Sequence, residues 1–546
     1  TKAGDGIVVS DITYYDGSAR PLQQVNVGAS PGGKDLVAPV VRDGVGGEAV
    51  SYLPFAINGN GNYRSQAVVE QNTFFTSLYG NNPMAYTSRR FNNGPDDRVI
   101  EQSAPGYSWR LDGGHTTRFS YRKNIASDKV KRYILEGSSV RLDTEYWPAE
   151  SLSVKEVTGT QGDVMLEYCD VQGNLVAKES RLINSKRLFT YEVRDVQGRL
   201  RYVIPPLQDS LFTTGTKSLS ELSKYCYYTE YDEYGRVYKQ YHPGAGYVLN
   251  LYDKRGRLVF VQDGKQRTNG TWSFTKYDDL DRPVISGICT GTEAGHKAGL
   301  QSQTIFGEQR GTTLHGYTNQ TYPTNVVTKD CYIITYYDDY NWSGQSAVAY
   351  STADAIGGVK SNDVLGLVTG TKTKVLGVTT DQWLLSAEYY DQKYRSIQSV
   401  MQLYPSGTEI TSNTHDFAGQ VTRAKVKQTI GSLVTEYNKY FTYDQQGRLV
   451  KIDQQITGDN VNGRVTIIEN VYDELGRLSA KKLHNGREIQ SYQYNVGGNV
   501  TSVSSSAFSY TLGYDQVGVT GATARYDGNI NAMTWKNGGG MEKAYI

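Results

Sequence analysis

The stretch that decides the fold is Tyr252-Asp253-Lys254-Arg255-Gly256-Arg257-Leu258, because close copies of it recur along the chain. Clean copies begin at Tyr231, Tyr252, Tyr443 and Tyr472, and all share Tyr, Asp, Gly and Arg at one spacing. A recurring unit of this kind is the signature of a repeat architecture, in which each unit packs mainly on its neighbours. The sequence therefore predicts an extended array, whose surface has to be understood before any site.

The repeated residues have the chemistry of a tight turn. An Asp at the first position of a type I turn accepts hydrogen bonds from backbone N–H groups two or three residues further on. The Gly takes a positive φ and closes a hairpin that contains a bulge. We assign this structural role to Tyr231, Asp232, Gly235, Arg236, Tyr252, Asp253, Gly256, Arg257, Tyr443, Asp444, Gly447, Arg448, Tyr472, Asp473, Gly476 and Arg477.

The recurring Arg allows two interpretations. In the structural one, each Arg pairs with the Asp of its own or a neighbouring turn and packs its stem on a Tyr. In the functional one, the arginines form a basic rim that binds an acidic partner. The same choice applies to the tyrosines, which either pack across strands or form a sugar-binding platform.

Degenerate copies extend the array over most of the chain. They lie at Asp16–Ala19, Asp43–Gly46, Asp170–Gly173, Asp195–Gly198, Asp278–Asp281, Asp338–Asn341, Asp391–Tyr394, Asp416–Gly419, Asn495–Gly498 and Asp515–Gly518. The flanks are rich in Tyr, Thr and branched residues, as strands are. Each unit is therefore predicted to be a β-hairpin of roughly 20–30 residues. Helical spacing favours short helices at 65–79 and 296–303, with weak helical character at 346–366.

The composition limits the class of partner. The chain has 546 residues with 57 Lys+Arg against 56 Asp+Glu, so its formal net charge is only +1. Nucleic acids and anionic membranes select a basic excess, so neither is an expected partner. The 44 tyrosines suit half-buried strand positions. No segment approaches the ~18 apolar residues of a membrane span.

The four cysteines are Cys169, Cys226, Cys289 and Cys331. No two have a Cys-x-x-Cys spacing, so a zinc knuckle or a redox pair is not expected. We expect free, buried thiols, with one or two disulfides as the alternative, whose pairing the sequence does not reveal.

A search for catalytic motifs gives weak candidates only. The chain has no Gly-x-Ser-x-Gly elbow, P-loop, His-Glu-x-x-His or EF-hand loop. His415-Asp416 is a possible base and orienting carboxylate, and Asn58–Asn62 is glycine-rich without a βαβ context. The acidic groups Asp96-Asp97, and Asp278-Asp279 with Asp281, could hold calcium, but the simpler interpretation is solvated loops. We therefore predict no catalytic, cofactor-binding or metal-binding residues.

The repeated phrase resembles the YD repeat of the Rhs/teneurin family, most densely over 168–283 and 390–500. Residues near Tyr526-Asp527-Gly528-Asn529-Ile530 resemble a further unit. Segments such as Tyr52-Leu53-Pro54-Phe55 and Ala104 to Trp109 resemble a module found ahead of bacterial Rhs repeats. We accordingly divide the chain into an N-terminal β module, 1–150, and a YD-repeat β-shell segment, 151–546.

The resemblance implies a mainly β fold in which consecutive hairpins form a spiralling ribbon or partly open hollow shell, with a few short helices. Strands ~4.8 Å apart give a ribbon of roughly 150–200 Å, which closes into a ring about 50–60 Å across. In bacterial members the shell often encloses a C-terminal toxin, released by a self-cleaving core that contains an Asp-Pro dipeptide. This chain has no Asp-Pro and stops at Ile546, so the core and toxin are expected to lie outside it.

The function expected from the resemblance is that of a non-catalytic shell in a secreted or surface protein. It would enclose or present a polypeptide cargo or toxin in interbacterial competition, with an outer-membrane or secretion component as a further partner. The alternative is a surface adhesin or carbohydrate-binding protein, and a third possibility is a cell-envelope enzyme. Both ends look cut from a longer polypeptide, so targeting is not readable from the sequence.

Overall fold

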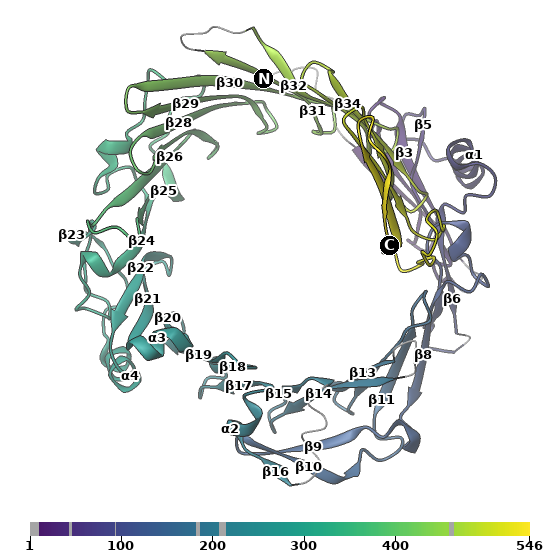
Figure 1. Ribbon diagram of the computed structural model, residues 1–546, viewed down its shortest axis with the longest axis horizontal. Coiled ribbons are helices and arrows are strands. Elements are labelled where there is room, and N and C mark those ends of the chain that lie inside the picture. Colours follow the sequence, from purple (N-terminus) through teal and green to yellow (C-terminus); the bar gives the residue numbers. More distant parts are fainter. Residues whose placement is uncertain (1–9, 43–45, 93, 182–185, 207–214, 458–462) are drawn as a thin grey trace.

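One antiparallel β-ribbon curls into a ring around a central opening (Figure 1). The computed structural model describes residues 10–42, 46–92, 94–181, 186–206, 215–457 and 463–546. Within these residues, 34 strands form a single sheet and three more form a small separate sheet. The predicted mainly β fold with hairpin repeats in a partly open shell is confirmed. No helix of the described residues is long and apolar enough to cross a membrane.

The ribbon begins with residues 10–123, which we call the N-terminal module from here on. Its strands pair from β1 to β3, β3 pairs with both β4 and β5, and the pairing continues from β4 through β6 and β7 to β8. Its elements are β1 (Ser10–Tyr15), β2 (Pro21–Val27), β3 (Asp35–Val41), β4 (Val50–Tyr52), β5 (Phe55–Ile57), α1 (Ala67–Tyr79), β6 (Tyr86–Phe91), β7 (Val99–Gln102), the 3₁₀ turn η1 (Tyr107–Trp109) and β8 (Thr117–Lys123). The helix α1 packs against β3 and β5 on the outside of the ring (Figure 1).

The next section carries an outer layer. Its elements are η2 (Ala126–Asp128), β9 (Lys131–Glu136), β10 (Ser139–Tyr146), β11 (Ser153–Thr158), β12 (Val164–Cys169), β13 (Leu175–Arg181), β14 (Arg187–Arg194), β15 (Leu200–Ile204), β16 (Thr216–Lys217) and α2 (Leu219–Leu222). Strand β11 pairs with β8, and the ribbon continues in sequence order. The small sheet of β9, β10 and β16 lies outside the ribbon (Figure 1).

The middle of the ribbon runs from β17 to β27. Its elements are β17 (Tyr227–Tyr231), β18 (Val237–His242), β19 (Gly246–Tyr252), β20 (Leu258–Gln262), α3 (Gly264–Asn269), β21 (Thr271–Tyr277), β22 (Pro283–Thr290), α4 (Glu293–Ser302), β23 (Arg310–Leu314), η4 (Thr328–Asp330), β24 (Cys331–Asp338), η5 (Gln345–Val348), β25 (Val364–Lys374), β26 (Trp383–Tyr390) and β27 (Ser396–Gln402).

The C-terminal ribbon completes the ring and passes the N-terminal module (Figure 1). Its strands are β28 (Thr408–His415), β29 (Val421–Ile430), β30 (Leu433–Tyr443), β31 (Leu449–Thr457), β32 (Val465–Tyr472), β33 (Leu478–Leu483), β34 (Glu488–Tyr494), β35 (Val500–Ser504), β36 (Phe508–Gly513), β37 (Ala532–Asn537) and β38 (Lys543–Tyr545). Each pairs with the strand before it in the chain.

The hydrophobic core is divided into three clusters instead of one. The first lies in the N-terminal module around Val37, Phe55 and Phe75. The second lies between β12–β17 and the outer layer, and the third lies between β19–β27 and the segments that cover them. Most of the C-terminal ribbon belongs to none of these clusters. Its stability must therefore come from strand pairing and from contacts between neighbouring hairpins.

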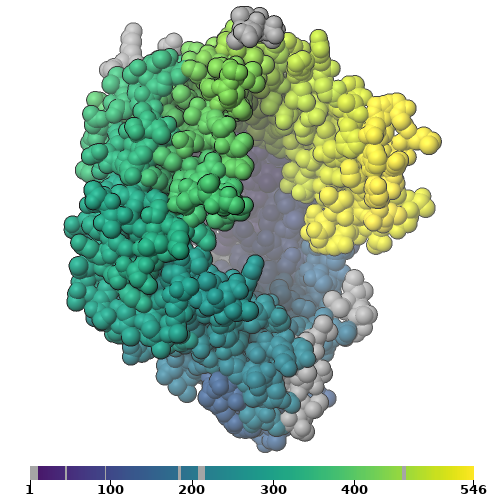
Figure 2. Space-filling model, turned by 60° about the vertical axis from the view of Figure 1, so that its left-hand side comes forward, coloured from purple at the N-terminus to yellow at the C-terminus, as the bar shows by residue number. Residues whose placement is uncertain are grey.

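The ring has a polar inner wall where its outer face is covered. On β12–β14 the residues Tyr168, Ala177 and Tyr191 are buried against the outer layer. Residues of the opposite parity face the interior, among them Glu167 and Lys178, whose charged groups are 3.1 Å apart. The space-filling view shows the hollow, which opens between the teal-to-green wall and the yellow C-terminal residues (Figure 2).

The helices expected from the sequence are confirmed in part. Helices were expected at 65–79 and 296–303, and α1 and α4 occupy those places. The weak helical character expected at 346–366 is not confirmed: after the end of η5 at Val348 the segment is mostly irregular loop up to the start of β25 at Val364. Gly358 has φ +73°, which a right-handed helix does not allow. The short helices α2 and α3 were not expected.

Candidate functional site

The turn at Asp253 shows how the repeated phrase folds. The Asp253 carboxylate accepts the backbone N–H of Arg255 and of Arg257, each at 2.9 Å. Its second oxygen accepts the Nε of Arg257 at 2.8 Å. The N–H of Gly256, which has φ +83°, donates to the Asp253 carbonyl. The Asp253 carboxylate thus accepts from the N–H groups two and four residues further on, whereas the sequence predicted N–H groups two or three residues further on. The difference arises because the bulge adds a residue to the turn.

The other clean copies have the same geometry. The arginine Nε donates to the aspartate at 2.7 Å in Asp232–Arg236, 2.6 Å in Asp444–Arg448 and 2.7 Å in Asp473–Arg477. The glycines Gly235, Gly447 and Gly476 have φ values of +79°, +78° and +81°. In each turn, the arginine charge is therefore neutralised inside the turn.

The tyrosines link each hairpin to the one before it. Each phenolic O–H donates to a backbone carbonyl in the preceding hairpin. The acceptor is the first residue after the turn of that hairpin. The bonds are Tyr231 to Leu200 (2.9 Å), Tyr252 to Val237 (2.9 Å), Tyr277 to Leu258 (2.7 Å), Tyr443 to Val421 (3.0 Å), Tyr472 to Leu449 (2.8 Å) and Tyr494 to Leu478 (2.8 Å). We call this series the tyrosine ladder.

The arginines reinforce the ladder. The guanidinium of Arg236 lies 4.5 Å from the ring centre of Tyr252, and that of Arg257 lies 4.7 Å from that of Tyr277. Arg395 also donates to the carbonyl of Asp416 in the next turn at 2.8 Å. The recurring Arg thus binds both its own turn and the next one. These contacts support the structural interpretation of the Arg over the basic rim.

Most degenerate copies form the same turn. The turns beginning at Asp16, Asp170, Asp195, Asp278, Asp391, Asp416 and Asn495 all place their side-chain oxygen on the N–H four residues on. Ala19, Asp281 and Tyr394 take the glycine position with φ of +59°, +63° and +61°. The prediction for Asp43–Gly46 falls mostly on residues 43–45, outside those that the structure describes.

Two predicted copies are wrong. Asp338 itself has φ +72°, and its carboxylate accepts Arg282 and the N–H of Gly366. A long connection follows it, so no strand returns immediately to close a hairpin. Asp515 accepts the hydroxyl of Ser108 at 2.7 Å instead of capping a turn.

Consecutive antiparallel strands alternate in direction, so every second connection lies at the same edge of the ribbon. The YD turns are such alternate connections, and they therefore share one edge. We call this the tip edge, made of the turns at 170–174, 195–199, 232–236, 253–257, 278–282, 391–395, 416–420, 444–448, 473–477 and 495–499. The opposite plain edge carries the remaining connections, such as 375–382, 403–407 and 430–433.

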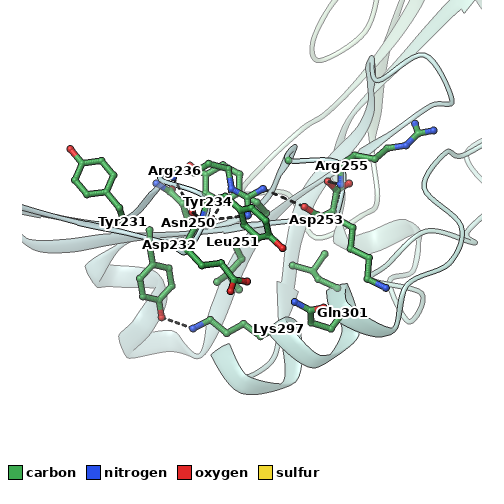
Figure 3. Close-up of a pocket in the computed structure, with 16 residues that line it drawn as sticks. Tyr231, Asp232, Tyr234, Arg236, Asn250, Leu251, Asp253, Arg255, Lys297 and Gln301 are labelled. Carbon is green, nitrogen blue, oxygen red and sulfur yellow. Dashed lines mark hydrogen bonds and ion pairs between the residues drawn. The ribbon is translucent and has the colours of Figure 1, made fainter. Parts of the chain in front are cut away.

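A hollow of about 770 Å³ lies at the tip edge between the turns 232–236 and 253–257 and the helix α4 (Figure 3). Tyr234 and Leu251 supply apolar wall, and Lys297 donates to the hydroxyl of Tyr238 at 2.7 Å. The described lining contains no histidine, serine or cysteine.

The weaker chemical candidates have structural roles. The N–H of Gly61, in the Asn58–Asn62 loop, donates to the buried Asp35 at 2.8 Å, so this loop binds the chain's own carboxylate. Asp416 caps its turn by accepting Gln420, while burial lowers the pKa of His415.

The acidic pairs are likewise tied to arginines. Asp96 pairs with Arg98 at 2.8 Å, and Asp278 pairs with Arg282 at 2.7 Å. Among the described residues, no group of three or more His, Cys, Asp or Glu is placed to hold a metal ion.

The cysteines are free thiols in the structure, with Cys226, Cys289 and Cys331 buried and Cys169 half-buried. Burial raises the pKa of Cys226 to about 11 and those of Cys289 and Cys331 to about 12. These thiols are therefore protonated at neutral pH and are poor nucleophiles.

The two ends of the ring meet at a seam that the sequence did not reveal. Turn residues of the C-terminal ribbon contact the N-terminal module: Glu474 pairs with Lys34, and Gln446 donates to the Gly28 carbonyl at 3.0 Å. Leu475 and Val496 pack against the module's hydrophobic cluster.

Further along, the same seam is aromatic. The indole N–H of Trp109 donates to the Tyr526 carbonyl at 2.7 Å, and the rings of His115 and Tyr526 stack 3.3 Å apart. These partners are separated by roughly 400 residues, so no local pattern points to them. In the described residues, the seam is made by side chains without strand pairing between β1 and the C-terminal ribbon.

Comparisons with known proteins agree with the repeat pattern. Residues 2–123 match the family described as a domain of unknown function, DUF6443, and residues 472–507 match the RHS repeat. No curated protein sequence matches the chain.

Solved structures of toxin complexes also align with the chain at low similarity. The crystal structure of TcdB2-TccC3-Cdc42 is 14% identical with a TM-score of 0.45, over 98% of this chain and 26% of that chain. The Photorhabdus luminescens Tc holotoxin pore is 13% identical with a TM-score of 0.38, over 97% and 26%. The chain thus spans about a quarter of the length of these proteins. On these two family matches, the chain carries a DUF6443 domain at residues 2–123 and an RHS repeat at residues 472–507, and its recurring turns have the pattern of that repeat.

Proposed function

We propose that this chain is a non-catalytic shell segment of a secreted or surface protein, which encloses or presents a polypeptide cargo such as a toxin. The observation that carries the proposal is the ring itself. One continuous ribbon bounds a hollow, and its ends are held together across the seam (Figures 1 and 2). Interbacterial competition is the setting in which such a cargo would be delivered.

The wall supports an enclosing role in two ways. Its covered sections face the interior with paired charges such as Glu167 and Lys178, which leaves a wet surface that does not bind unfolded segments tightly. Its tyrosines and arginines are used between hairpins, as at Tyr252 and Arg236, so they stiffen the wall. That use favours the shell over the carbohydrate-binding alternative.

Protease protection in the full-length protein that contains these residues tests the proposal. We expect a segment outside residues 1–546 to resist proteinase K when the ring is closed. The double variant Trp109→Ala, Tyr526→Ala should open the seam and expose that segment, whereas Leu433→Ala, an exposed residue of the plain edge, should not. Equal digestion of all outside segments with the ring closed would refute the cargo role. Peptide mass spectrometry identifies the protected segment.

A further inference from the structure

The free part of the tip edge carries exposed apolar side chains. Each YD turn has two variable residues between its Asp and its Gly position, and these form the tip. Five turns place an apolar or aromatic residue there that is 70–97% exposed: Val171, Val196, Tyr234, Leu280 and Phe417. The hydrogen bonds of the turn come from other positions, such as Asp170 and Asn174. The turn therefore does not require these side chains to be apolar.

The same tip positions are partly buried at the seam. Leu475 and Val496 hold the equivalent places in their turns, and both pack against the hydrophobic cluster of the N-terminal module. Glu474, beside Leu475, forms an ion pair with Lys34. Gln446, at the tip of the turn 444–448, donates to the Gly28 carbonyl. The chain thus already contains an interface in which YD tips dock on polypeptide.

The seam joins two different edges of the ribbon. Gly28 and Lys34 follow β2, which ends at the plain edge, and His115 lies between β7 and β8 at that same edge. The seam therefore joins a tip edge to a plain edge, as successive turns of a spiral would. Elsewhere the plain edge carries exposed apolar residues as well, namely Leu376, Tyr404, Ile430 and Leu433, each 52–66% exposed.

The tip edge alternates projections with hollows. One hollow lies between the turns at 170–174 and 195–198, another between those at 232–236 and 253–256, and a third beside Leu280. Tips that project beside hollows of this kind are the form of surface that interdigitates with a partner. The net charge of +1 adds no repulsion between copies.

We propose that the tip edge of one copy docks on the plain edge of a second copy, repeating the seam between molecules and lengthening the shell. The partner is a second copy because the plain edge that the tips recognise in the seam is a feature of this chain, and its free portion is apolar in the same way. Such a head-to-tail interface is heterologous, so it does not close on itself after two copies.

Two edge variants and their mixture test this inference by sedimentation velocity. The wild-type chain should show a mass that rises with concentration above the 60.7 kDa of one copy. The double variant Val196→Asp, Phe417→Asp places charges on the tip edge and should abolish its docking. The double variant Leu433→Asp, Leu376→Asp does the same for the plain edge. Each charge would be buried unpaired in the interface, so the dissociation constant should rise roughly 100-fold or more, leaving each variant alone a single copy.

The equimolar mixture is decisive, because each variant keeps the edge that the other lacks. It should form a dimer and nothing larger, which also shows that both variants are folded. Met165→Asp, on the interior face of β12, is the matched control and should associate like the wild type. A wild-type chain that stays monomeric at all concentrations, or a plain-edge variant that still dimerises alone, would overturn the proposal. Neither result depends on whether the hollow holds a cargo.

Discussion

At the scale of single residues, the wall rests on one carboxylate in each turn. The side chain of Asp253 is fully buried, yet it satisfies two backbone N–H groups and the guanidinium of Arg257. An Asp at this position fits because it is acceptor-only and short enough to reach both its own turn and the arginine. The glycine beside it fits because its φ is positive.

We predict that Asp253→Ala destabilises the two hairpins that flank it by about 2–4 kcal/mol, because two backbone N–H groups of the turn and the Nε of the largely buried Arg257 lose their acceptor. Amide hydrogen exchange across β19–β22 measures the local free energy of opening. Asp16→Ala in the exposed turn of β1 and β2 is the matched control and should have a smaller effect. Equal effects at the two turns would contradict the importance of burial.

A second residue-scale prediction concerns pH. His296 stacks on Phe260 with ring centres 4.1 Å apart, and burial lowers its pKa to about 4. A base whose pKa is lower in the folded state binds fewer protons there, so stability is full above pH ~6.5 and falls as the pH drops toward 4. The loss should reach up to about 3 kcal/mol.

His296→Phe should therefore flatten the dependence of the urea midpoint between pH 6.5 and 4. His242→Phe, on β18, controls for the loss of a histidine elsewhere in the wall. The same slope in wild type and His296→Phe would show that this side chain is not responsible.

At the scale of the element, the hairpin was predictable and its exceptions were not. Tyr, Asp, Gly and Arg each have a local role, so their spacing alone predicts the turn. Asp338 and Asp515 carry only the relaxed pattern without the Arg. The chain after them does not return immediately as a strand, and their carboxylates accept hydrogen bonds from Arg282 and Ser108 instead. The helix α3 did leave a sequence signal, since Asp263 and Gln266 form a capping box and Gly270 ends the helix with φ +64°.

The ladder gives a test in the C-terminal ribbon, most of which belongs to no hydrophobic cluster. Tyr472→Phe removes the bond to the Leu449 carbonyl and should cost about 1 kcal/mol in the local opening of β31–β33. Hydrogen exchange should rise in both hairpins that the bond joins. Tyr545→Phe on the exposed edge strand β38 should leave exchange there unchanged. A change confined to the mutated hairpin would contradict the ladder.

At the scale of the whole molecule, the ring depends on contacts between distant parts of the chain. The repeat pattern predicted consecutive hairpins, and the resemblance to the YD repeat implied that they wind into a curling ribbon. It did not predict the seam, since Trp109 and Tyr526 are brought together only once the ring is complete. The sequence around Trp109 and around Tyr526 has no motif or spacing that sets these residues apart from other aromatic residues of the chain.

The seam should be the place where the ring opens. Replacing Trp109 and Tyr526 by alanine removes an indole hydrogen bond and the His115 stack, while the hairpins on either side keep their own turns. We expect a larger radius of gyration by small-angle X-ray scattering with unchanged circular dichroism. An unchanged radius of gyration would mean that the other seam contacts suffice.

Electron cryomicroscopy of the full-length protein that contains these residues tests the central claim most directly. A shell predicts the ring of residues 10–546 around its hollow, with density inside it for polypeptide from outside this range. A ring with additional polypeptide only on its outer surface, or separate compact sandwiches with filled cores, would contradict the claim.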